Sequence, residues 1–373
     1  MLIGVDASRA VGGERTGTEN YSYYLIQALL RTDRVSRFRL YFNRPPEEGL
    51  FPRDGRVEWR VMPFPRFWTH LRLSLEMLTA PPDALYVPSH VLPLVHPRCS
   101  VATVHDLGYL RFPEAHTRGQ RSYLDWSTRY NAKHARRVIV DSLATAEDLV
   151  ASYGTPRDRI RPAYPAGVDG LAPVEDSEAL ASVRQRYGTG PRYLLYVGTL
   201  QPRKNLVMLL RAFAALVAHS ALPVDVRLVL AGRKGWLYDE IVAESRNGAV
   251  EGRVVLPGYV RSDDLSALLS GALAFVFPSL HEGFGLPVLE AMACGAPVIC
   301  SSASALPEVA GDAALLVDPR DQDRWAEAIA RVCARPALRA QLRAKGLERA
   351  ATFSWDRCAR SVLEALQEAA AQQ

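Results

Sequence analysis

A chain of 373 residues exceeds one ordinary hydrophobic core, which favours two domains. Its 48% hydrophobic and 23% charged residues indicate a globular protein and exclude a disordered one, and no apolar run approaches the roughly 18 to 20 residues of a membrane-spanning helix. The five cysteines are scattered without a C-x-x-C pair, so we expect reduced thiols in the cytosol and no cysteine-based metal site.

The N-terminal half alternates short apolar, β-branched runs with segments of helical period. "MLIGVDASRA" leads directly into a strand without a basic and apolar leader, so we expect no secretory signal. A helix is predicted at Glu19–Arg31. Strands are predicted at Leu2–Val5, Arg39–Tyr41, Ala84–Val87, Ser100–Val104 and Val138–Val140.

The C-terminal half repeats this alternation. Helices are predicted at Leu206–His219 and Leu265–Leu269. Strands are predicted at Tyr193–Val197, Val226–Leu230, Arg253–Leu256, Ala274–Phe277 and Pro297–Cys300. Strands that alternate with helices predict an α/β protein with parallel sheets covered on both faces.

The polar stretch "AGVDGLAPVEDSEALASVRQRYGTGP" separates the two halves. We therefore expect two doubly wound, Rossmann-like domains that face each other across a cleft, with a linker and helix at 171–190. The N-terminal domain would span 1–170 and the C-terminal domain 191–350. A last helix at 351–373 either stays with the second domain or crosses back to the first.

The net charge of +5 is concentrated in the first half, where residues 1–170 carry 23 Lys and Arg against 18 Asp and Glu. This excess suits an ordinary surface or attraction to an anionic membrane. The stretch at 62–80, "MPFPRFWTHLRLSLEMLTA", fits either an interfacial segment or a helix packed on the core. We expect a cytoplasmic protein, with peripheral membrane contact as the alternative to a plain surface. No basic helix or aromatic platform indicates a nucleic-acid partner.

Two acids stand out in "HEGFGLPVLEAMACG", which follows the strand predicted at Ala274–Phe277. Ligands of such sheets bind beyond the carboxyl ends of the strands. Pro287 suits the first position of a helix, and Gly295 suits the left-handed residue that ends one. Glu282 then lies in a glycine-rich loop and Glu290 one turn into the helix.

Both acids can therefore face the same ligand. A carboxylate accepts two hydrogen bonds side by side, which suits the vicinal hydroxyls of a ribose or a sugar. Gly283 and Gly285 allow the backbone N–H groups to approach closely, and the helix start favours an anion. The alternative is structural: Glu290 complements the helix N-terminus and Glu282 is solvated.

A second loop, "YVGTLQPRKN", follows the strand that ends before Gly198. Arg203 and Lys204 precede a helix for which Asn205 is the expected cap. The chain has only four lysines against 41 arginines, so Lys204 is not part of a general basic surface. A guanidinium beside an ammonium at a strand end suits a diphosphate.

Two further patterns carry weaker signals. "DASRAVGGERTGTEN" brings Gly12 and Gly13 after the first strand, but it is not G-x-G-x-x-G, which argues against a nicotinamide oxidoreductase. The D-x-D at Asp321 and Asp323 would suit a metal, but its context favours Asp321 as a helix N-cap. We therefore expect no metal.

The block "HEGFGLPVLEAMACGAPVICSSASALPEVAGDAALLVDP", with its Glu-x7-Glu, resembles the retaining glycosyltransferases of family 4, which have the GT-B fold. "YVGTLQPRKN", "VVLPGYV", "TVHDL" and "FSWDRCARSVLEAL" are similar to the same family in the same order. The resemblance covers nearly the whole chain and is strongest across Tyr193–Pro319.

The resemblance implies a role for each matching residue. Glu290 would hold the ribose of the donor and Glu282 the transferred sugar, while Arg203 and Lys204 would neutralise the diphosphate. His105, with Asp106 beside it, would be catalytic together with Glu282. Further donor contacts would come from Gly12, Gly13, Gly198, Tyr259, Val260, Gly283, Phe284, Gly285 and Leu286.

The resemblance thus implies a retaining enzyme that moves a hexose of mannose or glucose type from a nucleotide-diphosphate sugar. The nucleotide would be GDP or UDP, the acceptor a hydroxyl of a glycan, a lipid-linked molecule or a small molecule, and no cofactor would be needed. A sugar-nucleotide epimerase of the same fold is the strongest alternative. A non-catalytic sugar- or nucleotide-binding protein is another.

Overall fold

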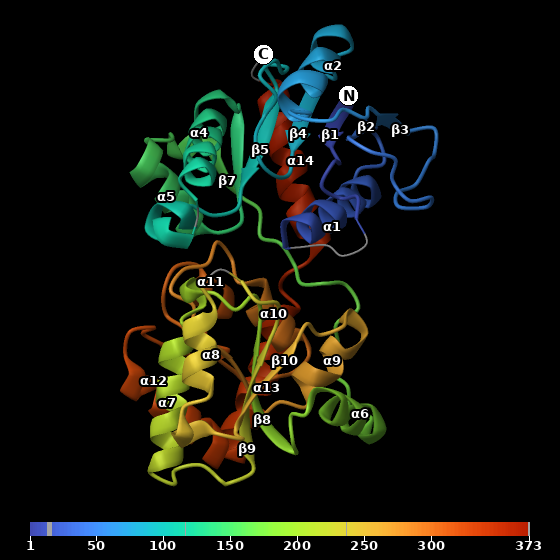
Figure 1. Ribbon diagram of the computed structural model, residues 1–373. Helices are drawn as coiled ribbons and strands as arrows, with labels where there is room; N and C mark the ends of the chain where they lie inside the picture. Colours follow the sequence, from blue (N-terminus) through green and yellow to red (C-terminus); the bar gives the residue numbers. More distant parts are fainter. Residues whose placement is uncertain (13–16, 116, 236, 372–373) are drawn as a thin grey trace. The chain divides into compact units, whose positions relative to one another are not determined.

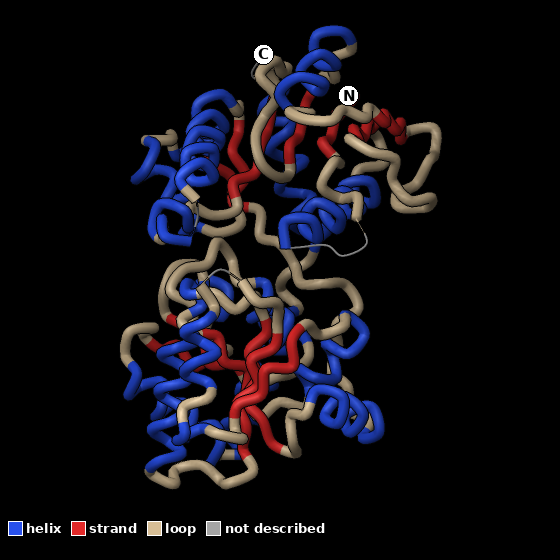
Figure 2. Tube along the Cα trace, viewed as in Figure 1, coloured by secondary structure: helices blue, strands red, loops and turns tan. Residues whose placement is uncertain are grey.

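The computed structural model of this protein describes residues 1–12, 17–115, 117–235 and 237–371 (Figure 1). The chain divides into two compact units. The N-terminal unit consists of Met1–Ala166 and Ser354–Gln373, and the C-terminal unit of Gly167–Phe353. Both units are parallel α/β sheets with helices on their faces, as the alternation of strands and helices predicts (Figure 2).

The N-terminal unit is built on seven strands, all paired in parallel, in the order β3-β2-β1-β4-β5-β6-β7. Their bounds are β1 Leu2–Asp6, β2 Arg37–Phe42, β3 Val57–Val61, β4 Ala84–Val87, β5 Ser100–Val104, β6 Arg137–Val140 and β7 Ile160–Pro162. The sequence does not reveal β3 and β7. Both are edge strands, where partial exposure weakens the apolar pattern, and β7 has only three residues.

Helices of the N-terminal unit include two from opposite ends of the chain. The α-helices are α1 Gly17–Thr32, α2 Ser74–Thr79, α3 Gly108–Arg111, α4 Arg118–His134, α5 Leu143–Tyr153 and α14 Trp355–Ala371, with short helices η1 Thr69–Leu73, η2 Pro113–Ala115 and η3 Arg157–Arg159. The last helix, α14, packs on α1, where the rings of Trp355 and Tyr24 stack at 5.7 Å (Figure 1).

The C-terminal unit has six parallel strands in the order β10-β9-β8-β11-β12-β13. Their bounds are β8 Arg192–Val197, β9 Val226–Ala231, β10 Val254–Gly258, β11 Ala274–Phe277, β12 Val298–Ser301 and β13 Ala314–Val317. The sheet is wound outward in both directions from β8 and β11, so the carboxyl ends of these two central strands lie side by side. Such a switch point is where ligands of open α/β sheets bind.

Helices cover both faces of this second sheet (Figure 2). They are α6 Ser177–Tyr187, α7 Leu206–Ala218, α8 Asp239–Ser245, α9 Ser262–Ser270, α10 Leu286–Ala293, α11 Leu306–Ala310, α12 Gln322–Ala334 and α13 Pro336–Ala350, with short helices η4 Pro202–Lys204 and η5 Gly248–Val250. The segment expected as a linker, 171–190, belongs to this unit. Its helix α6 packs on α9, and Tyr187 donates a 2.6 Å hydrogen bond to Asp264.

No helix within the described ranges is both long and apolar enough to cross a membrane.

Candidate functional site

The loops after β8 and β11 are joined into one structure at the edge of the C-terminal sheet. The backbone N–H of Leu280, after β11, donates to the carbonyl of Arg203 in η4, after β8, at 2.9 Å. Asn205 also links these loops, since its side-chain nitrogen donates to the carbonyls of Pro278 (3.3 Å) and Pro319 (2.6 Å). The prediction that the Asn205 side chain caps α7 is therefore wrong. Asn205 occupies the cap position at φ 58°, but its side chain is used as a donor between loops.

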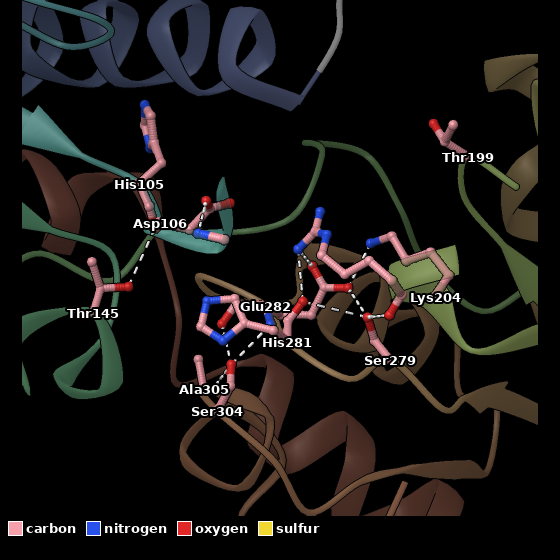
Figure 3. Close-up of polar contacts among 12 residues, drawn as sticks. His105, Asp106, Thr145, Thr199, Lys204, Ser279, His281, Glu282, Ser304 and Ala305 are labelled. Atoms are coloured by element: carbon pink, nitrogen blue, oxygen red, sulfur yellow. Dashed lines mark hydrogen bonds and ion pairs between the residues drawn. The ribbon is translucent and has the colours of Figure 1, made fainter. Parts of the chain in front are cut away.

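Glu282, Lys204 and Arg203 form one buried ionic cluster (Figure 3). Lys204 Nζ lies 2.5 Å from Glu282 Oε1, and Arg203 Nη1 lies 3.4 Å from Glu282 Oε2 and 2.6 Å from the carbonyl oxygen of His281. Ser279, which the sequence did not single out, donates its hydroxyl to Glu282 Oε1 at 2.5 Å. The acid and the two cations were expected at one ligand, and the fold holds them in mutual contact.

The protonation state of Glu282 follows from this cluster. Burial by itself raises the pKa of the carboxyl, but the charges of Lys204 and Arg203 and the hydrogen bonds from Lys204 and Ser279 outweigh it and lower the pKa to about 2. Glu282 is therefore a carboxylate at neutral pH. It can accept hydrogen bonds from hydroxyl groups, but it has no proton to give as a general acid.

The backbone around Glu282 is held in place by Ser304. The N–H of Glu282 donates to Ser304 Oγ at 2.8 Å, and the hydroxyl of Ser304 donates to the carbonyl of Glu282. Gly285 precedes α10 with φ 107°, a backbone conformation that favours glycine, and an added Cβ would lie 2.5 Å from Leu306 Cδ2. Gly283, Phe284 and Leu286 thus lead into the first turn of α10 along a path that Ser304 and Gly285 define.

Glu290 lies in α10, with Pro287 in the first turn and Gly295 left-handed just past its end (φ 72°), as predicted. The side chain is partly buried against Gly167, where a Cβ would lie 3.2 Å from Glu290 Cγ. Burial raises the pKa of Glu290 to about 7, against the opposing effect of a hydrogen bond from the Val168 backbone. Unlike Glu282, this acid titrates near neutral pH.

That titration predicts a pH-dependent affinity for nucleotide. If the carboxylate accepts the ribose hydroxyls, binding requires the ionised form, which prevails above a pKa of about 7. The dissociation constant of a nucleoside diphosphate should therefore be about tenfold higher at pH 6 than at pH 8. Calorimetry at several pH values measures this change of the dissociation constant with pH. The same titration of Glu290→Gln gives the pH dependence that is due to the nucleotide alone. Equal slopes in the two proteins would contradict the role.

The donor contacts expected at Gly198, Tyr259 and Val260 also lie just after strands, namely β8 and β10. Tyr259 follows β10 and is about half exposed, with the Arg233 guanidinium 4.9 Å from its ring centre, while Val260 is buried. A Cβ at Gly232, after β9, would lie 1.9 Å from the carbonyl oxygen of Gly198. These two loops therefore approach each other as closely as backbone allows. Arg233 is a candidate that the sequence patterns did not reveal.

In the N-terminal unit, His105 follows β5 and is oriented by an acid from the next strand. Its Nδ1 lies 2.7 Å from Asp141 Oδ2, and its ring packs edge-on to Tyr21 at 4.6 Å. Nε2 is buried and has no hydrogen-bond partner among the described residues. Burial alone would lower the pKa of His105, but the charge of Asp141 and its hydrogen bond raise it. Asp141 was not singled out, although an acid directly after a buried strand was the available signal.

Asp141→Asn is expected to lower the pKa of His105, because the largest effect that opposes burial is then lost while the weaker effect of Asp106 remains. Ring-proton NMR titration of both proteins measures the change, with His219 of the other unit as an internal control. An unchanged His105 titration would show that Asp141 does not set the proton affinity of this ring.

Asp106 and Gly12, two further expected site residues, lie in loops of the N-terminal unit. Asp106 Oδ1 accepts a 2.8 Å hydrogen bond from the N–H of Gly108 at the start of α3, so its carboxylate stabilises a turn (Figure 3). Gly12 lies beside Arg44, whose Nη2 would be 3.4 Å from an added Cβ. Gly13 lies outside the described residues.

Asp321 is the N-cap of α12, as predicted, and accepts a 3.0 Å hydrogen bond from the N–H of Arg324. Over the part of the chain that the structure describes, no three His, Cys, Asp or Glu side chains are grouped to hold a metal ion.

Comparison with known proteins connects both units to one family. The profile of the glycosyl transferases group 1 matches residues 181–349, and that of glycosyltransferase family 4 matches residues 15–169. The O-antigen chain mannosyltransferase B of Escherichia coli is 34% identical over 270 residues, which cover 71% of this chain and 69% of that protein. The D-inositol 3-phosphate glycosyltransferase of Salinispora arenicola is 32% identical over 298 residues, 75% of this chain and 64% of that protein.

Solved structures agree on the fold. Sucrose-phosphate synthase from Thermosynechococcus elongatus superposes over 100% of both chains with a TM-score of 0.75 at 21% identity. HepE of Anabaena, solved in complex with UDP and glucose, covers 98% of this chain and 99% of its own with a TM-score of 0.71 at 18% identity. The chain therefore belongs to the glycosyltransferases of group 1 and family 4, and it is a hexosyltransferase with the GT-B fold.

Proposed function

We propose that the protein is a retaining, metal-independent glycosyltransferase that moves a mannose- or glucose-type hexose from a GDP- or UDP-linked donor to a hydroxyl group. The observation that carries this proposal is the buried cluster of Glu282, Lys204 and Arg203 at the switch point of the C-terminal sheet. The cluster combines a permanent carboxylate for sugar hydroxyls with two cations for a diphosphate. Glu290, on the adjoining helix, would accept the ribose hydroxyls.

The cations have a defined task in the reaction. As the bond between the anomeric carbon and the diphosphate oxygen breaks, negative charge grows on the diphosphate and positive charge on the sugar. Arg203 and Lys204 would stabilise the departing diphosphate, and buried cations do so more strongly than solvated ones. The acceptor oxygen would attack the same face, and its proton would pass to the departing phosphate oxygen. Glu282, ionised, would hold the sugar hydroxyls during this exchange.

The acceptor would bind in a pocket of the N-terminal unit. This pocket has a volume of about 420 Å³ and lies at the carboxyl ends of β1, β2 and β4. Its lining includes Asp6, Asn43, Gln120 and the aromatic side chains Trp68 and Tyr123. Oδ1 of Asn43 is buried without a hydrogen-bond partner in the described parts of the chain, so a hydroxyl donor would satisfy it. Polar side chains interleaved with aromatic ones suit a sugar or polyol.

The name of one similar protein, an O-antigen chain mannosyltransferase, supports glycan synthesis as the setting. The name of another, a D-inositol 3-phosphate glycosyltransferase, suits a small-molecule acceptor. We place the reaction in the cytoplasm, with the N-terminal unit in peripheral contact with a membrane.

The test is a product assay with GDP-mannose, GDP-glucose, UDP-glucose and UDP-galactose, each with and without mannosyl oligosaccharides as acceptor, in buffer containing EDTA. Release of nucleotide that depends on an acceptor, with a product whose anomeric configuration matches the donor, supports the proposal. An epimerase would instead convert the donor without any acceptor. An inverted anomeric centre or a strict need for divalent metal would contradict the proposed mechanism.

A further inference from the structure

The N-terminal unit exposes a row of large apolar side chains, which we call the apolar ridge: Phe67, Leu71, Leu75, Leu78 and Leu94. The three leucines at 71, 75 and 78 are each more than half exposed. Their spacing puts them on one side of η1 and α2, while Leu73 and Met77 bury the other side in the core. The segment is thus packed on the core, which was one of the two expectations, and it also presents an apolar outer face.

The loop before β5 lies against this helix. The N–H of Val95 donates to Ser74 Oγ at 3.2 Å, so Leu94 and Val95, both exposed, extend the ridge beyond α2. The hydroxyl of Tyr130 in α4 donates to the carbonyl of Leu94 at 3.2 Å and fixes the loop from its other side.

A strip of aromatic side chains runs beside the ridge along α4, which we call the aromatic strip: Tyr123, Trp126, Tyr130 and His134. The rings of Trp126 and Tyr130 stack at 5.5 Å, and those of Tyr130 and His134 at 4.4 Å. His70 of η1 joins the strip to the ridge, with its ring 5.3 Å from that of Trp126. Tyr123 and Trp126 are each about two-fifths exposed or more, so they present amphipathic rings to solvent.

The strip ends at a basic pocket of about 710 Å³, at the amino ends of β5, β6 and β7. Its cationic lining consists of Arg98, Lys133, Arg136, Arg137 and Arg159, and two histidines, His96 and His134, also line it. Asp158 is the acid in the lining, and Arg137 is paired with Glu368 at 3.0 Å. The pocket therefore keeps an excess of positive charge. Burial, together with His96, Lys133 and Arg159, lowers the pKa of His134.

Ridge and pocket share one loop, in which Leu94 and Val95 are followed directly by His96 and Arg98. Apolar side chains that penetrate the acyl boundary, Trp and Tyr at headgroup level, and Arg and Lys against phosphates are the three components of an interfacial lipid site. We propose that this face of the N-terminal unit docks on an anionic lipid bilayer, with the apolar ridge inserted and a lipid phosphate in the basic pocket. The proposal is independent of the sugar transfer.

One consequence does rest on the proposed function. Trp68, Thr69 and Tyr123 line the 420 Å³ pocket proposed for the acceptor, and Thr69 and Tyr123 belong to η1 and to the aromatic strip. The pocket thus opens beside the docking face. A lipid-linked acceptor held in the bilayer would present its headgroup there.

The test is co-sedimentation of the full chain, without donor or acceptor, with vesicles of phosphatidylcholine alone or of equal parts phosphatidylcholine and phosphatidylglycerol. We expect binding to the anionic vesicles that is roughly tenfold tighter or more than to the neutral ones. Leu71→Ser/Leu75→Ser/Leu78→Ser should weaken binding to both. Arg98→Glu/Lys133→Glu should remove the preference for anionic lipid.

Matched controls are exposed residues that belong to neither the apolar ridge, the aromatic strip nor the basic pocket. Val35→Ser/Val224→Ser, at two positions that are each 91% exposed, and Arg246→Glu/Arg320→Glu should bind as the unchanged protein does. Circular dichroism checks that all variants unfold at similar temperatures. Absence of binding to both vesicles, or binding equally affected by the test and control variants, would overturn the proposal. So would inhibition by free inorganic phosphate that matches the effect of the Arg98/Lys133 variant, since the pocket would then be a soluble-anion site.

Discussion

Arg203→Ala combined with Lys204→Ala is expected to lower kcat for sugar transfer by roughly 10² to 10⁴-fold, at about 1.4 kcal/mol for each tenfold. The reason is that both cations lie in one buried cluster, where their charge is poorly screened. Because stabilisation of the departing diphosphate matters most as the bond breaks, the loss should fall on kcat. Steady-state kinetics with the preferred donor measures it.

The double substitution also leaves Glu282 buried without its cationic partners, which destabilises the fold. Adding Glu282→Gln to the double variant shows how much of this destabilisation comes from the unpaired acid. The triple variant should regain unfolding temperature while its turnover stays low. Arg246→Ala/Lys345→Ala, which removes an exposed Arg and a partly exposed Lys that pairs with Asp312, is the matched control. Full activity in the double variant would remove the leaving-group role.

Glu290→Gln is expected to raise the dissociation constant of a free nucleoside diphosphate by roughly 10- to 100-fold, since a hydrogen bond to a charged group contributes about 1.5–3 kcal/mol. The effect should be present without any sugar, because the ribose belongs to the nucleotide. Calorimetric titration of both proteins measures it. Glu327→Gln, an exposed acid in α12, is the control.

The competing explanation of Glu290 is that it stabilises the start of α10. In that case the substitution would lower the unfolding temperature and leave nucleotide affinity unchanged. Since burial holds the pKa of Glu290 near 7, its carboxylate gains little from the fold alone. A ligand that donates two hydrogen bonds to the carboxylate would explain why an acid occupies position 290.

Local rules predicted the elements around the site well. Pro287 at the start of α10, Gly295 after its end and Asp321 before α12 act within a few residues of themselves, so their sequence context is sufficient. The central strands of both sheets were predicted for the same reason, since most of them are continuous buried apolar runs. The edge strands β3, β7 and β13 were not predicted, because partial exposure dilutes the apolar pattern, with Leu316 over a third exposed. The fourth edge strand, β10, was predicted although it is also partly exposed.

The contacts within the site could not be predicted from local sequence, because they join residues that are far apart in the chain. The pairing of Glu282 with Lys204 joins residues 78 apart in sequence, and that of His105 with Asp141 joins residues 36 apart. The residue types predicted what each group can bind, but not that the acid and the cations would contact each other. Asn205 is a second example. An asparagine side chain can cap a helix or link two loops, and the local sequence does not distinguish these two roles. The resemblance to family 4 glycosyltransferases, read from short motifs, is confirmed over both units.

The most direct test of the account is calorimetric titration of the full chain with UDP, GDP, ADP and TDP in the presence of EDTA. The account predicts that one of these nucleotides binds clearly, that binding is lost or strongly weakened in Glu290→Gln, and that added magnesium changes little. Such a result would identify the base and support a donor site in which Arg203 and Lys204 take the place of a metal. Failure of all four nucleotides to bind would contradict the assignment of the Glu282–Glu290 region as a donor site.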